Sequence, residues 1–368
     1  MRFHCRIASR RLIPAAALLA LLLSNAVAQT VPADPLELAT GAITTAQTGD
    51  ARASLIALLE RARQNNNLHV AGGAPFDMRV SFTASGGTSY SGPGTLEEMW
   101  LGERQWRWVE QLAGFNQTRV VNGGWAYDTP PQAYQPLRLH MLRQSIFWPV
   151  AGNLSTAFLR SAPAAWQGMA LTCVLLSHSA NAANTAGRQW QEMEYCIDPK
   201  TGLLQRLSLV PGMYTMFDYA DAWQFNHATL PRRFTVIQHG APILQASVDS
   251  LVPLANTDSA GFTPTDQMKA PGPVIQQPTR YSVTIPSPTG QAEEPAVIHI
   301  EVAADGHVLE AEPLDAANSA LAATALDYVK GYTFPPAYRG RVPLQREMFF
   351  RLHFSAPQAP VSATPASN

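Results

Sequence analysis

The chain has 368 residues, of which 46% are hydrophobic and 14% are charged, with a formal net charge of −1 at pH 7. This length suits two domains with ordinary hydrophobic cores, and a net charge this close to zero argues against a nucleic-acid-binding surface. The 29 prolines fall mostly outside the segments that have helical or strand periodicity.

Residues 1–28 have the pattern of an export signal. Four arginines precede an apolar run over residues 12–23, and Ala26-Val27-Ala28 supplies the small residues that a signal peptidase needs. A run of about a dozen apolar residues is too short to span a bilayer, which takes about 20. We therefore expect export to the periplasm with cleavage, and membrane association if the signal stays uncleaved.

A polar segment, residues 29–50, precedes the first amphipathic helix, which we expect over residues 51–66 with Asp50 as its cap. From residue 76 to about 252 the hydrophobic period is two, interrupted by a helical stretch at 136–147. A run of strands with short turns predicts a curved antiparallel sheet, or half-barrel, with a helix over one face. The expected strands are 76–84, 94–102, 105–111, 117–122, 125–127, 170–178, 189–197, 203–210, 213–219, 222–228, 231–238 and 242–250.

Cys173 and Cys196 remain after removal of the signal, and each falls in an expected strand. If these strands form a hairpin centred near residues 183–184, the two cysteines face each other at the Cβ separation that a disulfide requires. An oxidising compartment preserves such a bond. We expect a structural cross-strand disulfide, because no Cys-x-x-Cys motif indicates a redox function.

All eight tryptophans lie before residue 254. Trp106 and Trp108 share one face of their strand, and Trp100 and Trp125 fall on neighbouring strands. A concave face lined by these four side chains is a candidate site for an acyl chain or another apolar ligand. The alternative is that they fill the core between the sheet and its helix.

Residues 51–254 resemble the curved-sheet fold of LolA/LolB-type lipoprotein carriers. The resemblance rests on the leading helix, on Gly-x-Leu-Glu-Glu-x-Trp at 94–100, on Asp-Pro-Lys-Thr-Gly at 198–202, and on Tyr219-x-Asp221 with the later Leu230-Pro231. It implies a periplasmic carrier of a lipid or a lipoprotein acyl chain. A generic antiparallel β-domain is the alternative.

Residues 255–294 are rich in Pro, Gly, Thr and Gln and predict an interdomain linker. A small α+β domain is expected over residues 295–355, with strands at 297–302 and 308–313 joined by an Asp305-Gly306 turn. A helix at 319–330, capped by Asp315 or Asn318, and a last strand at 344–354 complete it. We expect residues 356–368 to form a disordered tail.

The order of elements in residues 295–355 resembles the C-terminal domain of TonB-family proteins. The matching residues are Asp305-Gly306, the helical leucines, Tyr332 in place of the usual Trp, Phe334, Pro336, Ala337, Gly340 and Phe354. The resemblance implies a non-enzymatic envelope protein that binds an outer-membrane transporter by strand addition, in a transport context. The last strand is then the expected free edge, with Arg346, Phe349, Arg351 and His353 as partner-binding residues.

No motif in the sequence predicts catalysis, cofactor binding or metal binding. The histidines are scattered, and His299 and His307 are expected on solvated strand positions. Glu97 and Glu98 point to opposite faces of one strand, so they cannot act as a carboxylate pair. No Gly-x-Ser-x-Gly or phosphate-binding loop occurs. The sequence therefore predicts a non-enzymatic protein with no cofactor.

Overall fold

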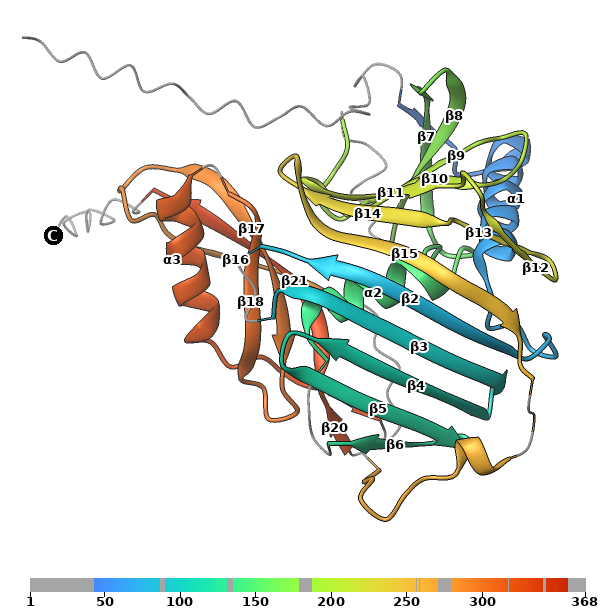
Figure 1. The fold of residues 1–368 in the computed structure, drawn as a ribbon. Coiled ribbons are helices and arrows are strands. Elements are labelled where there is room, and N and C mark those ends of the chain that lie inside the picture. Colours follow the sequence, from blue (N-terminus) through green and yellow to red (C-terminus); the bar gives the residue numbers. More distant parts are fainter. Residues whose placement is uncertain are drawn as a thin grey trace, which may run out of the picture. The chain divides into compact units, whose positions relative to one another are not determined.

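An open sheet of 13 strands is the largest element of the computed structural model (Figure 1). Each neighbouring pair in it is antiparallel. In the order of pairing, its strands are β1 (Thr44–Thr45), β7 (Phe158–Trp166), β8 (Met169–Ser177), β9 (Met193–Ile197), β10 (Leu204–Val210), β11 (Met213–Asp218), β14 (Arg233–Gln238), β15 (Ala241–Pro253), β2 (Phe76–Ala84), β3 (Gly92–Gly102), β4 (Gln105–Leu112), β5 (Phe115–Asn122) and β6 (Trp125–Thr129).

The structure describes residues 43–86, 90–130, 135–178, 187–255, 257, 259–270, 279–316, 318–339 and 342–356. The chain divides into two compact units, residues 1–31 and 32–368, and all contacts given below lie within the second. The expected signal, the first part of the polar segment and nearly all of the expected tail lie outside the described residues. None of the described helices has an apolar stretch long enough to cross a bilayer.

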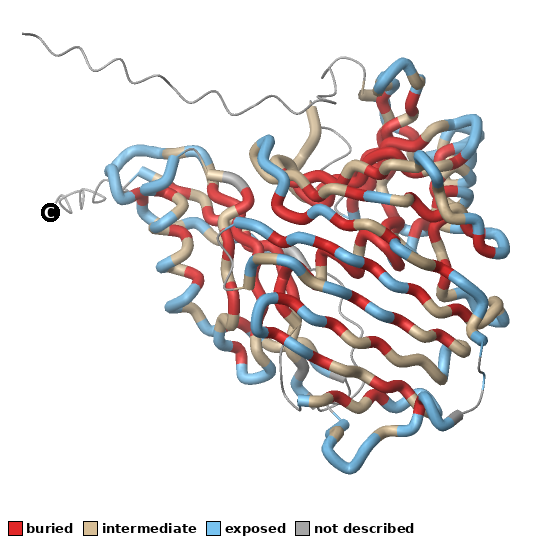
Figure 2. Tube along the Cα trace, in the orientation of Figure 1, coloured by how far each residue is buried: buried red, intermediate tan, exposed pale blue. Residues whose placement is uncertain are grey.

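The alternation along β2 to β5 explains why the large sheet exposes one face. Buried and exposed positions succeed each other along these strands (Figure 2), as expected when one face meets a core and the other meets water. The expected strand at 76–84 coincides with β2. The structure adds β7, which the sequence did not indicate because its Ala- and Pro-containing run has weak strand propensity.

The expected strand at 222–228 is wrong in its pairing. It forms a separate small hairpin of β12 (Trp223–Phe225) and β13 (Ala228–Leu230), outside the large sheet. The sheet is also not a simple meander, in which each strand pairs with the next one in the sequence. The late strand β15 pairs with the early strand β2.

Two helices cover the core of the large sheet. Helix α1 (Gly49–Asn66) buries one stripe, Leu55, Leu59, Ala62 and Asn66. Its N-cap is Thr48, and Asp50 lies in its first turn, so the expected cap is wrong. Helix α2 (Leu137–Phe147) is buried at nine of its eleven residues, which indicates packing on nearly all sides.

The C-terminal part forms a four-stranded sheet in the order β16 (Thr279–Pro286), β21 (Arg346–Ser355), β17 (Glu293–Val302) and β18 (Val308–Asp315). Helix α3 (Ser319–Lys330) packs on one face, where Ile298 and Ile300 meet Leu321 and Val329. Asn318 accepts a hydrogen bond from the Leu321 amide at 2.9 Å, so of the two candidate caps Asn318 is confirmed. A short hairpin, β19 (Ala337–Arg339) and β20 (Val342–Leu344), precedes the last strand.

The expected linker at 255–294 needs correction. It contains β16 and also the 3-10 helix η3 (Ser259–Phe262), whose Phe262 is buried. The signal for β16 is present in the sequence, because Tyr281, Val283 and Ile285 alternate with polar residues. The segment was nevertheless predicted as a linker, because prolines and glycines lie close to this alternating stretch.

The Asp305-Gly306 turn provides a test of this fold. Gly306 has φ +96°, and a Cβ added there would lie 2.3 Å from the Phe334 carbonyl oxygen. The Phe334 amide donates a hydrogen bond to the Gly306 carbonyl oxygen at 2.9 Å, which fixes this close approach. Gly290 has φ +76° but open space around its Cβ position, so it is a matched control for backbone conformation. We expect Gly290→Ala to cost about 1–2 kcal/mol and Gly306→Ala to cost about 2 kcal/mol more. Calorimetry of the two variants checks this, and equal melting temperatures would contradict the predicted clash.

Candidate functional site

The last strand, β21, is not a free edge. It pairs with β16 in parallel on one side and with β17 in antiparallel on the other. The expectation that residues 344–354 receive a partner strand is therefore wrong. The physical reason is that β16, unrecognised in the expected linker, occupies the position where a partner strand would bind.

The four candidate partner-binding residues of β21 lie in different environments. Phe349 is fully buried and stacks on the His299 ring at 4.7 Å, so it offers no surface to a partner. Arg351 is half-buried over the Trp190 ring at 5.5 Å. Arg346 and His353 are also half-buried, and burial lowers the pKa of both, with Arg351 adding to the effect at His353. The structure does not bring these four residues together as one exposed site.

Among the described residues, the two ends of the C-terminal sheet are β16 and β18. Along β16, Tyr281, Ser282 and Thr284 are exposed, whereas Val283 and Ile285 are half-buried. No charged residue lies between 281 and 285. Arg280 precedes this stretch in β16, but residues 281–285 themselves present unpaired backbone groups without the charged residue or internal proline that usually protects an edge.

Aromatic side chains continue from this edge onto the neighbouring surface. Tyr281 stacks on Phe350 at 5.5 Å, and Tyr332 contacts Phe334 at 4.8 Å. Tyr328 stacks on Tyr332 at 5.9 Å, and a hydrogen bond with Tyr281 raises the pKa of Tyr332. We call Tyr281, Tyr328 and Tyr332 the tyrosine row. Each is partly accessible, and their rings are supported from beneath by buried phenylalanines.

The four candidate apolar-ligand tryptophans do not line one cavity. Trp100 and Trp108 are almost fully buried members of the core, and the Arg143 guanidinium lies over the Trp108 ring at 3.4 Å. Trp106 is half-buried, with its ring 5.1 Å from that of Trp108. Trp125 is 60% exposed on β6. For the first two, the structure therefore shows core packing.

The hollows near this core also differ from an acyl-chain site. A cavity between α2 and strands β10 and β11 measures about 10 Å³, room for about one water molecule. A surface hollow of about 480 Å³ lies at the ends of β3, β4 and β5, lined by residues such as Pro93, Leu112 and Phe115. Its volume falls within the range of small-molecule sites, but none of the four candidate tryptophans lines it.

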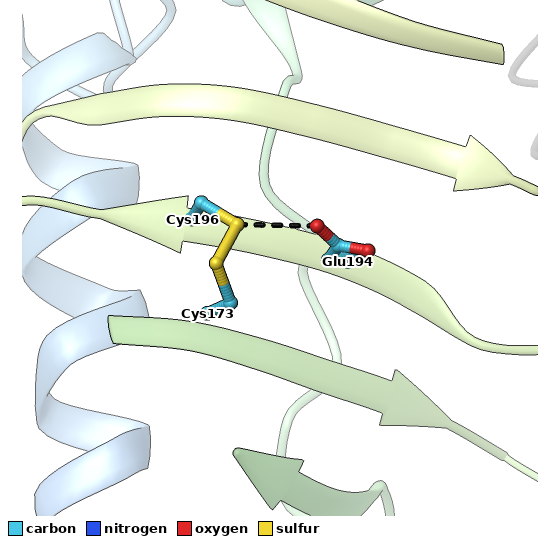
Figure 3. Close-up of side chains that lie close together, drawn as sticks. All are labelled: Cys173, Glu194 and Cys196. Carbon is cyan, nitrogen blue, oxygen red and sulfur yellow. Dashed lines mark hydrogen bonds between the residues drawn. A yellow bond between two sulfur atoms is a disulfide. The ribbon is translucent and has the colours of Figure 1, made fainter. Parts of the chain in front are cut away.

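The expected disulfide is confirmed. Cys173 and Cys196 lie directly opposite each other on β8 and β9 and are bonded, with a Cα–Cα distance of 3.9 Å and both side chains buried (Figure 3). The Glu194 carboxylate lies 3.2 Å from Cys196 Sγ. These three side chains lie close enough together to hold a metal ion, but sulfurs bonded to each other are not thiolate ligands.

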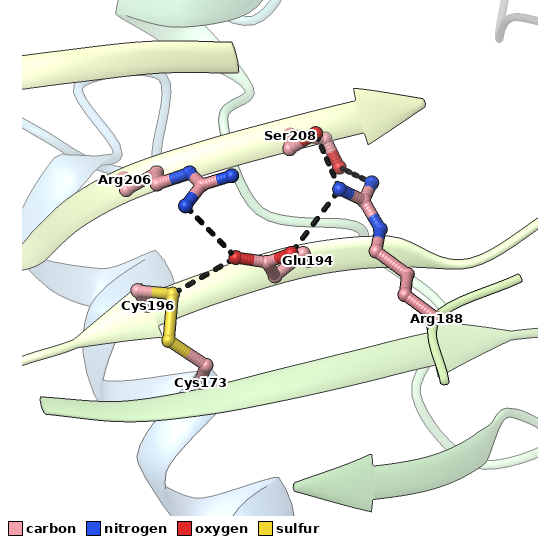
Figure 4. Close-up of a disulfide and its surroundings, with 6 residues drawn as sticks. All are labelled: Cys173, Arg188, Glu194, Cys196, Arg206 and Ser208. Carbon is pink, nitrogen blue, oxygen red and sulfur yellow. Dashed lines mark hydrogen bonds and ion pairs between the residues drawn. A yellow bond between two sulfur atoms is a disulfide. The ribbon is translucent and has the colours of Figure 1, made fainter. Parts of the chain in front are cut away.

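A buried ionic network surrounds the disulfide (Figure 4). Glu194 pairs with Arg188 at 3.1 Å and with Arg206 at 3.5 Å, and Arg188 also donates to the Ser208 hydroxyl at 2.8 Å. Because two cations compensate the buried carboxylate, the site has the character of a structural network. The sequence did not indicate it, since Arg206 alternates with Leu207 as an exposed strand residue would.

A second buried network, also missed in the sequence, involves helix α2. Arg143 pairs with Glu98 at 3.1 Å and with Glu110 at 3.5 Å, and Glu98 also contacts His69 at 2.5 Å. Burial raises the pKa of Glu98, but Arg143 and His69 more than offset this and hold it below its usual value. The expectation that Glu97 and Glu98 face opposite sides is confirmed, because only Glu98 is buried.

Comparisons with known proteins identify structural neighbours only. No protein-family profile and no curated protein matches the chain. A LolA superfamily protein from Nitrosomonas europaea aligns over 57% of this chain and 97% of its own, with 11% identity and a TM-score of 0.35. A putative outer membrane lipoprotein-sorting protein domain from Vibrio parahaemolyticus aligns over 55% and 95%, with 9% identity and a TM-score of 0.34.

The Pseudomonas aeruginosa MucA/MucB complex aligns over 60% of this chain and 63% of the matched chain, with 14% identity and a TM-score of 0.27. Of the two sequence resemblances, these neighbours match the one to LolA-type proteins, and nothing in them supports the one to TonB.

The disulfide is expected to contribute to stability by restricting the unfolded chain. The cysteines are separated by 23 positions in the sequence, so loss of the bond through a Cys173→Ala/Cys196→Ala double variant should lower the free energy of unfolding by about 3 kcal/mol. Urea denaturation measures this, and reduced wild-type protein should match the variant. Two titratable thiols in the unfolded, unreduced mature protein, which lacks Cys5, would show that the bond does not form.

Proposed function

We propose that this chain is a non-enzymatic binding protein of the cell envelope that takes up an extended segment of a protein partner along the free edge of β16. The single observation that carries the proposal is the edge itself: a strand paired on one side among the described residues and uncharged from Tyr281 to Ile285. Strand addition to such an edge forms backbone hydrogen bonds with any extended sequence.

The tyrosine row gives this edge a means of selecting its partner. Tyrosine is enriched in protein interfaces because it combines a large apolar ring with a polar end. The rings of Tyr281 and Tyr332 are held in place by Phe350 and Phe334, so little side-chain entropy is lost on binding. We infer a partner segment with apolar or aromatic side chains beside its backbone.

The export pattern of residues 1–28 supports a periplasmic location for this interaction. A partner of the TonB-dependent transporter type, in a transport context, follows only from the resemblance of residues 295–355. The proposal at β16 does not require it, because backbone pairing accepts any extended segment.

A second proposal is that the large sheet carries a lipid or a lipoprotein acyl chain. The observation in its favour is the shallow anchoring of α1, which buries only Leu55, Leu59, Ala62 and Asn66 of its 18 residues. Because side chains fill the space beneath the helices, an acyl chain would have to displace α1 from the sheet before it could bind.

The strand-addition proposal predicts that charge on the edge prevents partner binding. We expect Ser282→Lys/Thr284→Lys to abolish site-specific crosslinking between Tyr281, replaced by a photoreactive residue, and an envelope protein in intact cells. Thr95→Lys, at an exposed position inside the large sheet, is the matched control and should leave the crosslink unchanged. A crosslink that persists in the double lysine variant would count against strand addition.

The carrier proposal has a separate test. Native mass spectrometry of protein purified without detergent should show the mass of an acyl-containing lipid on the chain if the large sheet carries one. Leu59→Lys, which places a charge under α1, should then remove the adduct. If the protein carries only its own mass, with and without added phospholipid, the carrier proposal fails and the strand-addition proposal is unaffected.

A further inference from the structure

The face of the C-terminal sheet turned away from α3 has an unusual composition. Instead of facing water, as expected of His299, it is buried, and Val297, Leu314 and Phe349 belong to the large core. His299 and Glu301 on this face have no exposed area. Two α2 residues and five ionisable side chains of this face form what we call the buried charge cluster: Arg138, His140, His299, Glu301, Glu310, Glu312 and Glu347.

Helix α2 contacts this face through charged groups. Arg138 Nη1 lies 2.6 Å from Glu312 Oε1. His140 Nε2 lies 3.0 Å from Glu301 Oε2, and its Nδ1 lies 3.8 Å from Glu347 Oε2. The cluster therefore connects α2 to three strands of the C-terminal sheet, β17, β18 and β21.

His299 occupies the centre of the cluster. Its Nε2 lies 2.6 Å from Glu347 Oε1, and its Nδ1 lies 3.4 Å from Glu312 Oε1. With a carboxylate at each ring nitrogen, only the protonated imidazole satisfies both, because it is the form with two donors. At the start of α2, the Leu137 amide donates to Glu310 Oε2 at 3.2 Å.

Within the cluster itself, the charges balance only if both histidines are protonated. Outside it, the buried carboxylate of Glu110 also interacts with His140, but it is paired with Arg143. Four carboxylates face a single arginine, and burial raises the pKa of Glu310, which favours its neutral form. Three carboxylates then remain, opposed by Arg138 and the two imidazoles. An uncompensated buried charge is strongly destabilising, so a neutral imidazole at either position would weaken the contact.

We propose that the buried charge cluster is an electrostatic latch that holds the C-terminal sheet against α2, and that the latch stays closed only while His140 and His299 both carry a proton. None of the residues in the buried charge cluster belongs to β16, so this proposal is independent of the proposed partner edge.

The sign of the pH dependence follows from the surroundings of each group. Burial lowers the pKa of His140, but Glu301 and Glu347 more than offset this, against a smaller repulsion from His299, and raise it to about 9. Burial likewise opposes protonation of His299, while Glu312 and Glu347 raise its pKa to about 9. The stabilisation by both histidines is thus fully present below their unfolded-state pKa of about 6.5 and is lost as the pH rises through about 9.

The carboxylates of the cluster determine how its stabilisation is lost at low pH. Burial raises the pKa of Glu312 and Glu347, but their cationic neighbours hold both below the usual glutamate value. The stabilisation that Glu312 and Glu347 contribute is fully present above the usual glutamate pKa. It is lost as the pH falls through the lower pKa values that these two groups have in the folded state. The latch is therefore closed at neutral pH and opens first on the alkaline side.

Hydrogen exchange of the full-length chain, corrected for intrinsic rates, tests the latch. We expect protection of α2 and β17 to fall by about tenfold or more between pH 7 and pH 9.5, while β2 and β3 keep theirs. His299→Gln and His140→Gln should show the same loss already at pH 7. His307→Gln is the matched control, because His307 is exposed in the turn of the same domain and pairs with Asp305.

Two further measurements decide the outcome if a variant folds poorly. His299→Gln/Glu347→Gln removes one charge of each sign and should recover most of the protection that His299→Gln loses. Imidazole resonances of the wild-type protein should titrate near pH 9. Titration of His140 and His299 near 6.5, or equal protection in His299→Gln and His307→Gln, would overturn the latch.

Discussion

Helix α2 is buried on nearly all sides, and the need to compensate its cationic side chains constrains both sheets. Arg143 meets Glu98 and Glu110 on the large sheet, while Arg138 meets Glu312 on the C-terminal sheet. Apolar residues of the same size would hold such a helix about as well, so ion pairs of this kind do more to define a unique arrangement than to add stability. A rotation of α2 by one residue would leave charges unpaired on both sides.

The local features of the fold follow from the sequence, and the non-local ones do not. The alternation of Phe76–Ala84, the opposed cysteines and the Asn318 cap depend on neighbours a few residues away or across one hairpin. The pairing of β16 with β21 joins residues about 70 positions apart, and a parallel pair leaves no turn between its strands to mark it. Without that pairing, the last strand looks like an edge.

The other main error was the expectation that His299 is solvated, and it arose because charged residues of β17 are buried. Val297, His299 and Glu301 alternate with Ile298 and Ile300, which is the pattern of a strand with one solvated face. Here the polar face is buried because α2 and two neighbouring strands supply opposite charges, and no periodicity within β17 reveals partners at Arg138 or Glu347. The consecutive apolar residues Met348, Phe349 and Phe350 were the available signal, since they require both faces of the sheet to be covered.

The same packing bears on what the molecule can bind. Trp100 and Trp108 are held in the core by stacking and by Arg143 over the indole ring, so an enclosed ligand would have to displace groups that already satisfy one another. Binding along β16 displaces no core side chain, because its backbone edge and the tyrosine row are already at the surface. A closed latch at the opposite face of β17 and β21 would also keep the sheet rigid, which lowers the entropy lost when a partner strand is added. The buried charge cluster and the exposed edge of β16 are therefore compatible within one molecule, because the cluster would hold rigid the sheet to which a partner strand adds.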